Sequence, residues 1–331
     1  MMQPHLNNSR LSVVIPTWNA ADLVLKAVGH LQQPGASQGG ELIVVDDGST
    51  DDTAGRVRQQ FPAVVVLEQG ANRGFGAAVN AGFQAARGSY LGTVNNDVVV
   101  SWSTLRELVS FLEENPEAAA AAPRIRDPTG ERQRVVFDFP RPPWDLLARR
   151  LDRRRRRTKA QTMESADPVR SEYLRGACVV FRRAALEEVG LFDEQFFMFA
   201  EELDLFRRLD GAGWTSWVVP RIVAEHAGGQ SSRAHQDRTV SSRFRRLSYR
   251  SMCRYYHKHH VWPVAMVMRA VLAVRVSGRL ARAVLDSARG RADAWWIGEH
   301  ARCVTTVMQP ATSNPVEPRL FPNWRPPRTN S

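Results

Sequence analysis

The chain has 331 residues, which is enough for one large α/β domain with an extension or for two domains. Its apolar share of 43% is ordinary for a folded globular protein, and its formal net charge of +11 favours anionic partners such as phosphorylated small molecules, acidic membranes or nucleic acid. Three widely spaced cysteines exclude a disulfide framework and a zinc site, and with a polar N-terminal segment that lacks a secretory signal they predict a cytoplasmic protein.

The first hundred residues alternate short apolar segments with segments of helical periodicity. The first segment, LSVVIP, is continuous and β-branched, as expected of a strand buried on both faces. Strands are predicted over residues 11–16, 41–46, 63–67 and 90–94, and helices over 21–31 and 77–86. Strands separated by such helices form βαβ units with right-handed crossovers, so a doubly wound, mostly parallel α/β sheet is predicted.

Polar residues follow several of these strands. Pro16, Thr17 and Asn19 leave the first strand, and Asp46 and Asp47 stand at the tip of the second. In open α/β sheets ligands bind outside the carboxyl ends of the strands, so these residues are candidates for ligand binding.

The fourth strand ends in Asn95, Asn96 and Asp97. A lone carboxylate between amides would suit a hard cation such as magnesium that itself holds phosphate oxygens. The same three residues also favour a plain turn after a strand, and the two interpretations are equally weighted on this segment alone.

The glycines of NRGFGAAVNAG, residues 72–82, invite comparison with the dinucleotide-binding fingerprint. That fingerprint follows the first strand and needs a third glycine at fixed spacing. Here the first strand is followed by TWNA, so a dehydrogenase is not favoured.

The middle of the chain predicts a helix over residues 102–115, a strand in EAAAAAPRI and an irregular stretch over 135–167. Within that stretch, Arg153–Arg157 form an uninterrupted basic run. The run is either a solvated loop or a surface for anionic lipid head groups or a diphosphate-bearing acceptor. No recognised nucleic-acid-binding module surrounds it.

Acidic residues gather at the start of a predicted helix after an aromatic cluster. Glu201 and Glu202 are adjacent, so their repulsion and partial burial would raise at least one pKa, as suits a general base. Asp204 and Arg208 are four residues apart and could simply pair along the helix, an alternative of equal weight.

Two glycine-containing segments flank this helix. Gly176 opens an apolar strand that runs to Phe181, and a strand over residues 215–220 is followed by EHAGGQSS. His226 in this glycine-rich loop is either structural or completes a metal or diphosphate site.

Beyond residue 234 the chain becomes an arginine-rich helical region. Residues 261–274 are apolar but contain Arg269, and they fall short of the roughly 20 residues that span a bilayer. Arg275, Arg279 and Arg282 share one side of a predicted helix. This helix either lies on an anionic membrane or packs on the domain with a solvated basic face. The tail from residue 309 is predicted to be disordered.

Taken together, six segments in order resemble the family 2 glycosyltransferases of GT-A fold, close to their bacterial rhamnosyltransferase-like branch. The resemblance covers residues 11–232 and rests on VVIPTWNA, ELIVVDDGSTDDT, NRGFGAAVNAG, NNDVVV, GACVVFRRAALEEVGLFDEQFFMFAEELDLFRRL and HAGGQSS. It divides the chain into a tail (1–10), a GT-A domain (11–233), a basic helical extension (234–308) and a second tail (309–331).

This resemblance implies an inverting transferase that uses a nucleotide-diphospho-sugar and a divalent cation, Mg²⁺ or Mn²⁺. It implies that Asp97 and His226 hold the metal, that Glu202 is the general base with Glu201 as the alternative, and that Asp204 and Arg208 lie on the acceptor side. The implied donor-binding residues are Pro16, Thr17, Asn19, Asp46, Asp47, Arg73, Gly74, Asn96, Asp97 and Gly176.

Two positions depart from the family pattern. Asn95 replaces the first acid of the metal-binding Asp-x-Asp, and Glu202 replaces an Asp that is one methylene shorter. The implied acceptor is a glycan or polyprenyl-linked lipid of the cell envelope at the inner membrane face. The donor is open among dTDP-rhamnose, UDP-sugars and GDP-sugars.

Two other classes compete with this interpretation. A nucleotidyltransferase would need a glycine-rich basic loop after the first strand, which TWNA does not provide. A non-enzymatic protein that binds anionic membranes or nucleic acid is supported by the charge alone.

Overall fold

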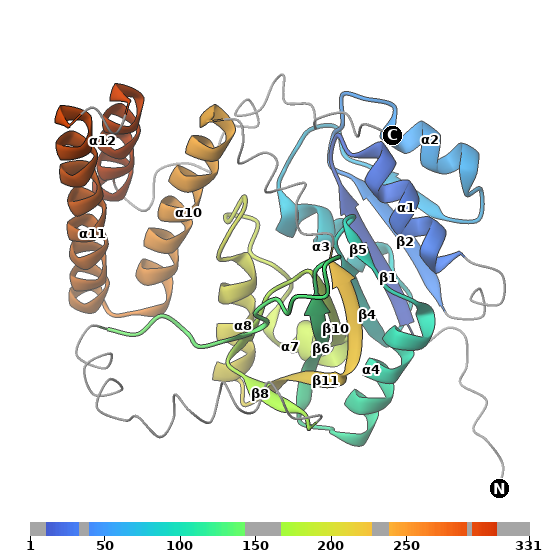
Figure 1. Cartoon of the computed structure of the whole chain (residues 1–331). Coiled ribbons are helices and arrows are strands. Elements are labelled where there is room, and N and C mark those ends of the chain that lie inside the picture. The colour runs from blue at the N-terminus through green and yellow to red at the C-terminus, as the bar shows by residue number, and fades with distance from the viewer. Residues whose placement is uncertain (1–10, 33–39, 143–166, 227–237, 290–292, 310–331) are drawn as a thin grey trace, which may run out of the picture.

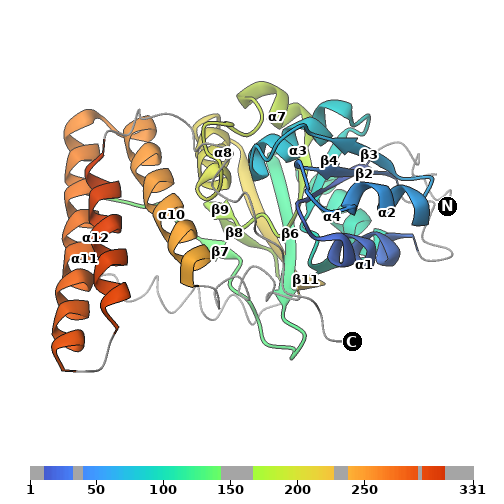
Figure 2. The same cartoon turned by 90° about the horizontal axis from the view of Figure 1, so that it is seen from above.

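The computed structural model describes residues 11–32, 40–142, 167–226, 238–289 and 293–309 (Figure 1). The two predicted tails, the Arg153–Arg157 run and the GGQSS segment lie outside these residues, apart from Gln309. Within the described residues, a twisted mixed sheet forms the centre, and three long helices stand beside it (Figure 2).

The N-terminal half is a run of parallel strands in the order β3-β2-β1-β4, each followed by a helix or turn. Its buried residues are mostly Val, Ile and Leu, which pack well on a sheet covered on both faces. The prediction of a doubly wound half is confirmed. The elements are β1 (Leu11–Thr17), α1 (Ala21–Leu31), β2 (Glu41–Asp46), α2 (Thr53–Gln60), β3 (Val65–Glu68), α3 (Phe75–Ala85) and β4 (Tyr90–Val94).

The C-terminal half continues the sheet in the order β10-β6-β11-β5, with β10 antiparallel to both neighbours and β6 parallel to β11. The strand β8 pairs with β11, while β7 and β9 form a separate ribbon. The elements are β5 (Val98–Val99), α4 (Trp102–Glu114), β6 (Ala118–Arg126), β7 (Val136–Phe137), β8 (Val169–Ser171), β9 (Tyr173–Leu174), β10 (Cys178–Arg182), α7 (Arg183–Val189), α8 (Glu201–Gly211) and β11 (Thr215–His226).

The strand β11 is longer than predicted. Pro220 has no N–H to donate, which made it the expected end of the strand. Instead, the ladder with β6 shifts register between Val219 and Val223 and then resumes. This irregularity accommodates Pro220 without ending the strand. The strand continues to His226, which pairs with Val98 of β5. His226 is therefore the last residue of a strand and does not lie in a loop.

The C-terminal region forms α10 (Arg238–His259), α11 (Trp262–Ala288) and α12 (Ala294–Met308). In Figure 2, α10 stands between α8 of the sheet domain and the α11–α12 pair. The three helices enclose a small core of Cys253, Val276, Cys303 and Val307. No helix of the described residues combines the length and apolarity that a membrane crossing requires.

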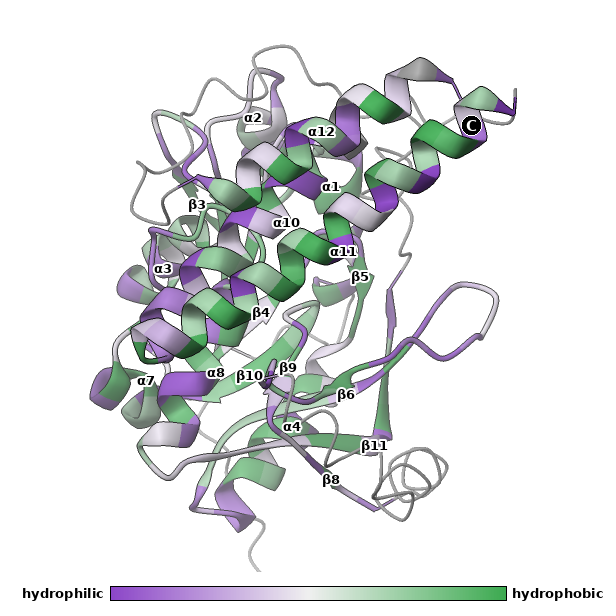
Figure 3. Cartoon of the chain, turned by 90° about the vertical axis from the view of Figure 1, so that its left-hand side faces the viewer, coloured by the Kyte–Doolittle hydropathy of each residue, from purple (hydrophilic) through white to green (hydrophobic). Residues whose placement is uncertain are grey.

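One long face of α11 is both exposed and uncharged. Trp262 is 68% exposed, Val274 72% and Leu285 55%. At about 100° per residue, these three side chains fall within one 140° sector of the helix, a sector that contains no Asp, Glu, Lys or Arg. Figure 3 shows the hydrophobic positions recurring along the outer side of α11.

Candidate active site

The carboxyl ends of β1 and β2 bring the first group of predicted residues together. The N–H of Asp47 donates to the carbonyl of Thr17 at 2.9 Å. The carboxylate of Asp47 accepts from the backbone N–H groups of Arg73 and Gly74, each at 2.8 Å. Burial raises the pKa of Asp47 to about 7, although these two N–H groups oppose the rise. A buried carboxylate thus ties two strand ends to the glycine loop before α3.

The turn after β1 is locked to the turn after β2. Asn19 adopts a positive φ of 48° and accepts from the N–H of Thr50 at 2.7 Å, while its own N–H donates to Ser49 Oγ at 2.8 Å. Asp46 accepts from the N–H of Ser49 at 2.7 Å, and burial raises its pKa. Asn19 and Asp46 therefore shape the rim, and Pro16 lies within β1 just before it.

The glycine loop that leads into α3 lies against a second polar segment. Gly74 has φ 93°, and a Cβ there would lie 2.0 Å from the carbonyl oxygen of Phe197, so only glycine fits. Arg73 pairs with Glu194 at 2.5 Å while its side chain stays 57% exposed. The guanidinium of Arg73 is thus at the surface beside the rim.

Asp97 and His226 meet although 129 positions separate them in the chain. Asp97 lies between β4 and β5, and the pairing of β5 with β11 brings His226 Nε2 to 3.2 Å from Asp97 Oδ1. The other ring nitrogen, Nδ1, lies 2.7 Å from Gln133 Oε1, which orients the ring. Asn96 reaches back and donates to Thr17 Oγ1 at 3.1 Å. The predicted metal-binding pair is therefore adjacent to the predicted donor-binding rim.

These residues suit a divalent cation in part. No group of three or more His, Cys, Asp and Glu that could hold a metal occurs in the described part of the chain. Asp97 and His226 supply two donors, and Asn95 Oδ1 is buried with no hydrogen-bond partner among the described residues. A carboxylate, an imidazole and an amide oxygen are donors that fit a divalent ion with further ligands from phosphate oxygens, and Asn95 lies two positions from Asp97 in the chain.

Glu202 lies at the start of α8, beside the turn that carries Asp97. Its Oε1 accepts from the N–H of Gly176 at 3.0 Å, and the next residue, Ala177, accepts from the N–H of Asn95 at 2.9 Å. A Cβ at position 176 would lie 2.7 Å from Glu202 Oε1. Gly176, predicted as a donor contact, therefore positions the Glu202 carboxylate. Burial raises the pKa of Glu202, against the opposing effects of Gly176 N–H and Arg175.

Glu201 has a different environment from its neighbour. It is 4% exposed, and its Oε2 is buried without a hydrogen-bond partner among the described residues. Burial, and then repulsion from Glu202, raise the pKa of Glu201 well above its usual value. Such a side chain is stable as a neutral acid.

The Asp204 carboxylate lies inside the protein, and Arg208 is partly exposed beside it. The Asp204 side chain has no exposed surface, and it pairs with Arg208 Nε at 3.0 Å, His259 Nε2 at 2.7 Å and Lys258 Nζ at 2.7 Å. Although burial opposes it, hydrogen bonds from His259 and Lys258 and the Arg208 charge lower the pKa of Asp204 to about 2. Both oxygens of Asp204 are thus occupied by a cluster that joins α8 to α10, and the predicted acceptor-side role stays a prediction.

Several residues that contact the predicted site residues could not be identified from any motif in the sequence. Gln133 orients His226, Glu194 pairs with Arg73, and Lys258 with His259 completes the Asp204 cluster. All of them come from segments more than 50 positions from their partners. Only the folded topology brings them to the site.

A family model, glycosyl transferase family 2, matches residues 12–190. The chain belongs to glycosyltransferase family 2. This match ends before α8, so Glu202 lies outside it.

Curated relatives agree with this membership. An N-acetylglucosaminyl-diphospho-decaprenol L-rhamnosyltransferase of Mycobacterium tuberculosis is 30% identical over 287 residues, covering 76% of this chain and 86% of that protein. A poly(ribitol-phosphate) beta-glucosyltransferase of Bacillus spizizenii is 32% identical over 111 residues, which are 32% of this chain and 18% of that one.

Solved structures identify the fold as GT-A, as predicted. The mannosyltransferase PcManGT of Pyrobaculum calidifontis, in complex with GDP-Man and Mn²⁺, superposes with a TM-score of 0.53 at 18% identity over 90% of this chain and 85% of that one. The GalNAc-T7 structure with UDP, GalNAc and Mn²⁺ gives a TM-score of 0.51 at 18% identity, over 67% of this chain and 44% of that one.

Proposed function

We propose that this family 2 glycosyltransferase moves a sugar from a nucleotide-diphospho-sugar to a polyprenyl-linked or glycan acceptor with inversion at the anomeric carbon. The proposal depends on two neighbouring backbone contacts. Gly176 N–H donates to the Glu202 carboxylate, and the carbonyl of the next residue, Ala177, accepts from Asn95 N–H at the start of the Asn95–Asp97 turn. A half-buried base and a candidate diphosphate site thus share one rim. The name of the Mycobacterium tuberculosis relative favours L-rhamnose as the sugar and a lipid diphosphate as the acceptor.

The donor side is assigned to the ends of β1, β2 and β4. Thr17 and Asp47 would contact the nucleoside, and Arg73, exposed at the rim, would lie near the base or the phosphates. Asp47 already accepts from two backbone N–H groups, so it also holds the glycine loop in place. The remaining donor contacts are assigned to Pro16, Asn19, Asp46, Gly74 and Asn96 as expected from the sequence.

Asp97 and His226 would hold a divalent cation, with Asn95 Oδ1 as a further neutral donor. When bound, such an ion neutralises the charge that develops on the departing diphosphate. Since only one ligand is a carboxylate, weak binding of the free ion is expected, with tighter binding in the presence of the donor.

Glu202 is assigned as the general base. Its Oε1 is oriented by Gly176 N–H, and its raised pKa brings the carboxylate closer to the pKa that suits proton removal from a hydroxyl near neutral pH. Attack of the deprotonated acceptor oxygen on the anomeric carbon, opposite to the diphosphate, would invert that carbon. Glu201, which is buried and has a raised pKa, is assigned a supporting role.

The extension is assigned to the membrane surface that carries a lipid-linked acceptor. Helices α10, α11 and α12 contain twelve Arg or Lys and two Asp or Glu, and the outer face of α11 is apolar. A basic helical unit with an uncharged outer face suits the interface of an anionic bilayer.

The decisive experiment is a donor screen on the full-length protein. Thermal shift and release of nucleoside diphosphate are measured with dTDP-, UDP- and GDP-sugars, each with Mg²⁺, with Mn²⁺ and with chelator. One nucleotide class is expected to stabilise the protein and to be turned over slowly in a metal-dependent manner. That response is expected to disappear in Asp97→Ala.

The matched control is Asp22→Ala, which removes an exposed carboxylate of α1 that pairs with Arg56 and should leave the response unchanged. If no nucleotide-sugar shifts the protein in any metal, the transferase proposal is wrong. If the metal-dependent thermal shift with a nucleotide-sugar persists in Asp97→Ala, the assigned metal site is wrong, but the donor site is still supported.

A further inference from the structure

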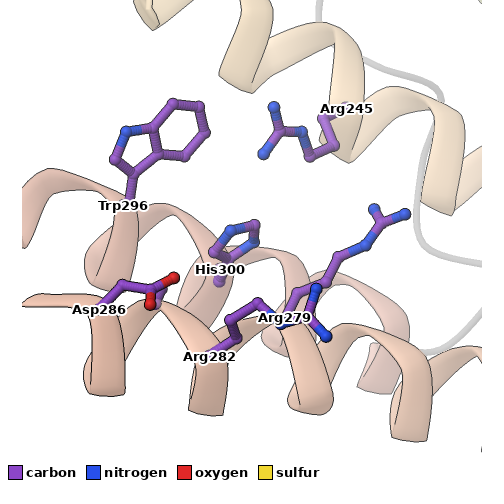
Figure 4. Close-up of a pocket in the computed structure, with 7 residues that line it drawn as sticks. Arg245, Arg279, Arg282, Asp286, Trp296 and His300 are labelled. Atoms are coloured by element: carbon purple, nitrogen blue, oxygen red, sulfur yellow. The ribbon is translucent and has the colours of Figure 1, made fainter. Parts of the chain in front are cut away.

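A pocket of about 470 Å³ lies between the three helices of the extension, away from the rim of the sheet. Figure 4 shows side chains from α10, α11 and α12 converging on it. Its lining is Arg245, Arg279, Arg282, Ala283, Asp286, Trp296 and His300. Nothing in the donor or acceptor assignments uses these residues.

The pocket carries an excess of positive charge. Three of its seven lining residues are arginines and one is an acid. Arg279 donates to Tyr249 Oη at 2.6 Å, and Arg245 lies over the ring of Trp296 at 5.3 Å. Among the described residues, none of the three arginines forms an ion pair, and Arg282 has no hydrogen-bond partner.

Other arginines of the same helices pair with a buried acid. Glu299 has no exposed side-chain surface, and it pairs with Arg246 at 3.0 Å and with Arg302 at 3.3 Å. The helices therefore contain one set of arginines with a buried counter-charge and one set without. The second set shares its pocket with a single acid, Asp286, so the net positive charge there attracts an added anion.

His300 also lies close to the positive charges of the pocket. Its ring stacks on Trp296 at a centroid distance of 5.9 Å, and its Nδ1 is buried with no hydrogen-bond partner among the described residues. Burial lowers the pKa of His300, and the charges of Arg245 and Arg279 lower it further against the opposing charge of Glu299. A neutral imidazole with a free nitrogen can still donate to an anion.

We propose that this pocket is a second anion site that binds a phosphate group. Arginine forks match phosphate oxygens with paired, charge-assisted hydrogen bonds, and Asp286 at the edge limits the affinity. The phosphate can belong to a phospholipid headgroup or to a free phosphate or diphosphate. The chemistry is the same for both sources, and the experiment separates them.

Binding is measured on the full-length protein and three variants. Calorimetry with inorganic phosphate and pyrophosphate is run in chelator, so that a metal-dependent donor site does not contribute. Flotation uses vesicles of phosphatidylglycerol with phosphatidylcholine, and of phosphatidylcholine alone. The variants are Arg282→Gln, Asp286→Asn and, as a matched control on the same helix, Arg275→Gln, whose residue is exposed and does not line the pocket.

Arg282→Gln is expected to weaken binding about tenfold, equivalent to about 1.4 kcal/mol, whereas Asp286→Asn strengthens it and Arg275→Gln changes it less than twofold. If Arg282→Gln weakens binding to vesicles alone, the ligand is a lipid headgroup. If it weakens binding of phosphate or pyrophosphate, the ligand is soluble. Equal losses in Arg282→Gln and Arg275→Gln, or no binding by any form, would overturn the proposal. Metal-dependent donor turnover by Arg282→Gln, which should be normal, tests the transferase function separately.

Discussion

Glu201 and Glu202 are adjacent in the chain, but their carboxylates lie in different environments. Glu202 accepts a backbone hydrogen bond from Gly176, whereas Glu201 Oε2 has no partner among the described residues. The first arrangement orients a carboxylate for proton transfer, and the second favours the neutral form of a carboxyl. The sequence alone offered both as bases.

We expect Glu202→Gln to lower kcat at least a hundredfold, because general-base catalysis contributes about 10²–10⁴ in rate. Donor binding, measured by thermal shift, should be retained. Glu201→Gln keeps the shape of a neutral acid and should stay within tenfold of the wild-type kcat.

The pH profile of kcat/KM tests the same assignment. A base acts only when it is deprotonated, and burial raises the pKa of Glu202 above 4.5. The value of kcat/KM should therefore fall on the acid side of the profile, at a pH above 4.5. The acid limb should persist in Glu201→Gln. A profile that loses this limb in Glu201→Gln would make Glu201 the base.

At the scale of single elements, the helix α8 is held at two points along its first turn. Glu202 contacts the β9–β10 turn, and Asp204 is buried among Arg208, Lys258 and His259. The helix that carries the proposed base is therefore fixed by α10 as well as by the sheet.

We expect Asp204→Ala to lower the free energy of unfolding by about 3–5 kcal/mol, because it leaves three basic groups around a vacated site. Urea denaturation at pH 7 measures the change. Asp210→Ala on the same helix removes an exposed partner of Arg207 and should cost less than about 1 kcal/mol.

The pH dependence of this cluster follows from the lowered pKa of Asp204. A carboxyl with a folded-state pKa of about 2 and an ordinary value of 3.8 stabilises the fold above pH 3.8, and the contribution is lost as the pH falls toward 2. The wild-type protein should lose stability over this acid range more steeply than Asp204→Ala. Equal slopes would show that the cluster does not control acid stability.

Most elements could be predicted from periodicity, because the buried strands are continuous apolar segments and the helices between them have regular spacing. The end of β11 could not, since a proline usually ends a strand and the register shift that accommodates Pro220 depends on β6. The Asp97–His226 contact likewise depends on β5 pairing with the extended β11. The family resemblance placed both residues at one site, but local sequence could not explain how they meet.

At the scale of the whole molecule, the positive charge is concentrated in the extension. Of the arginines predicted to form one basic face of α11, Arg279 and Arg282 line the pocket between the helices, and all three are exposed to solvent. The outward face is apolar, with Trp262, Val274 and Leu285 exposed. The basic side and the apolar side of α11 are therefore two different surfaces, as the helical spacing of the sequence indicates.

We expect Val274→Glu to weaken binding to phosphatidylglycerol vesicles at least fivefold, because a charge would enter an apolar face at the bilayer interface. Flotation measures the bound fraction. Gln59→Glu adds the same charge to an exposed site of α2 and serves as the control. Equal binding by Val274→Glu and Gln59→Glu would exclude this face as the contact.

The Asp204 cluster also limits how this enzyme can be recombined with its relatives. Residue 204 lies in the catalytic region, while residues 258 and 259 lie in the extension, so a hybrid that exchanges only one region separates an acid from its bases. Exchange of extensions between family members should therefore succeed only when these three positions are transferred as a set. The sheet domain and the extension would then be inherited as one unit, joined through these three side chains.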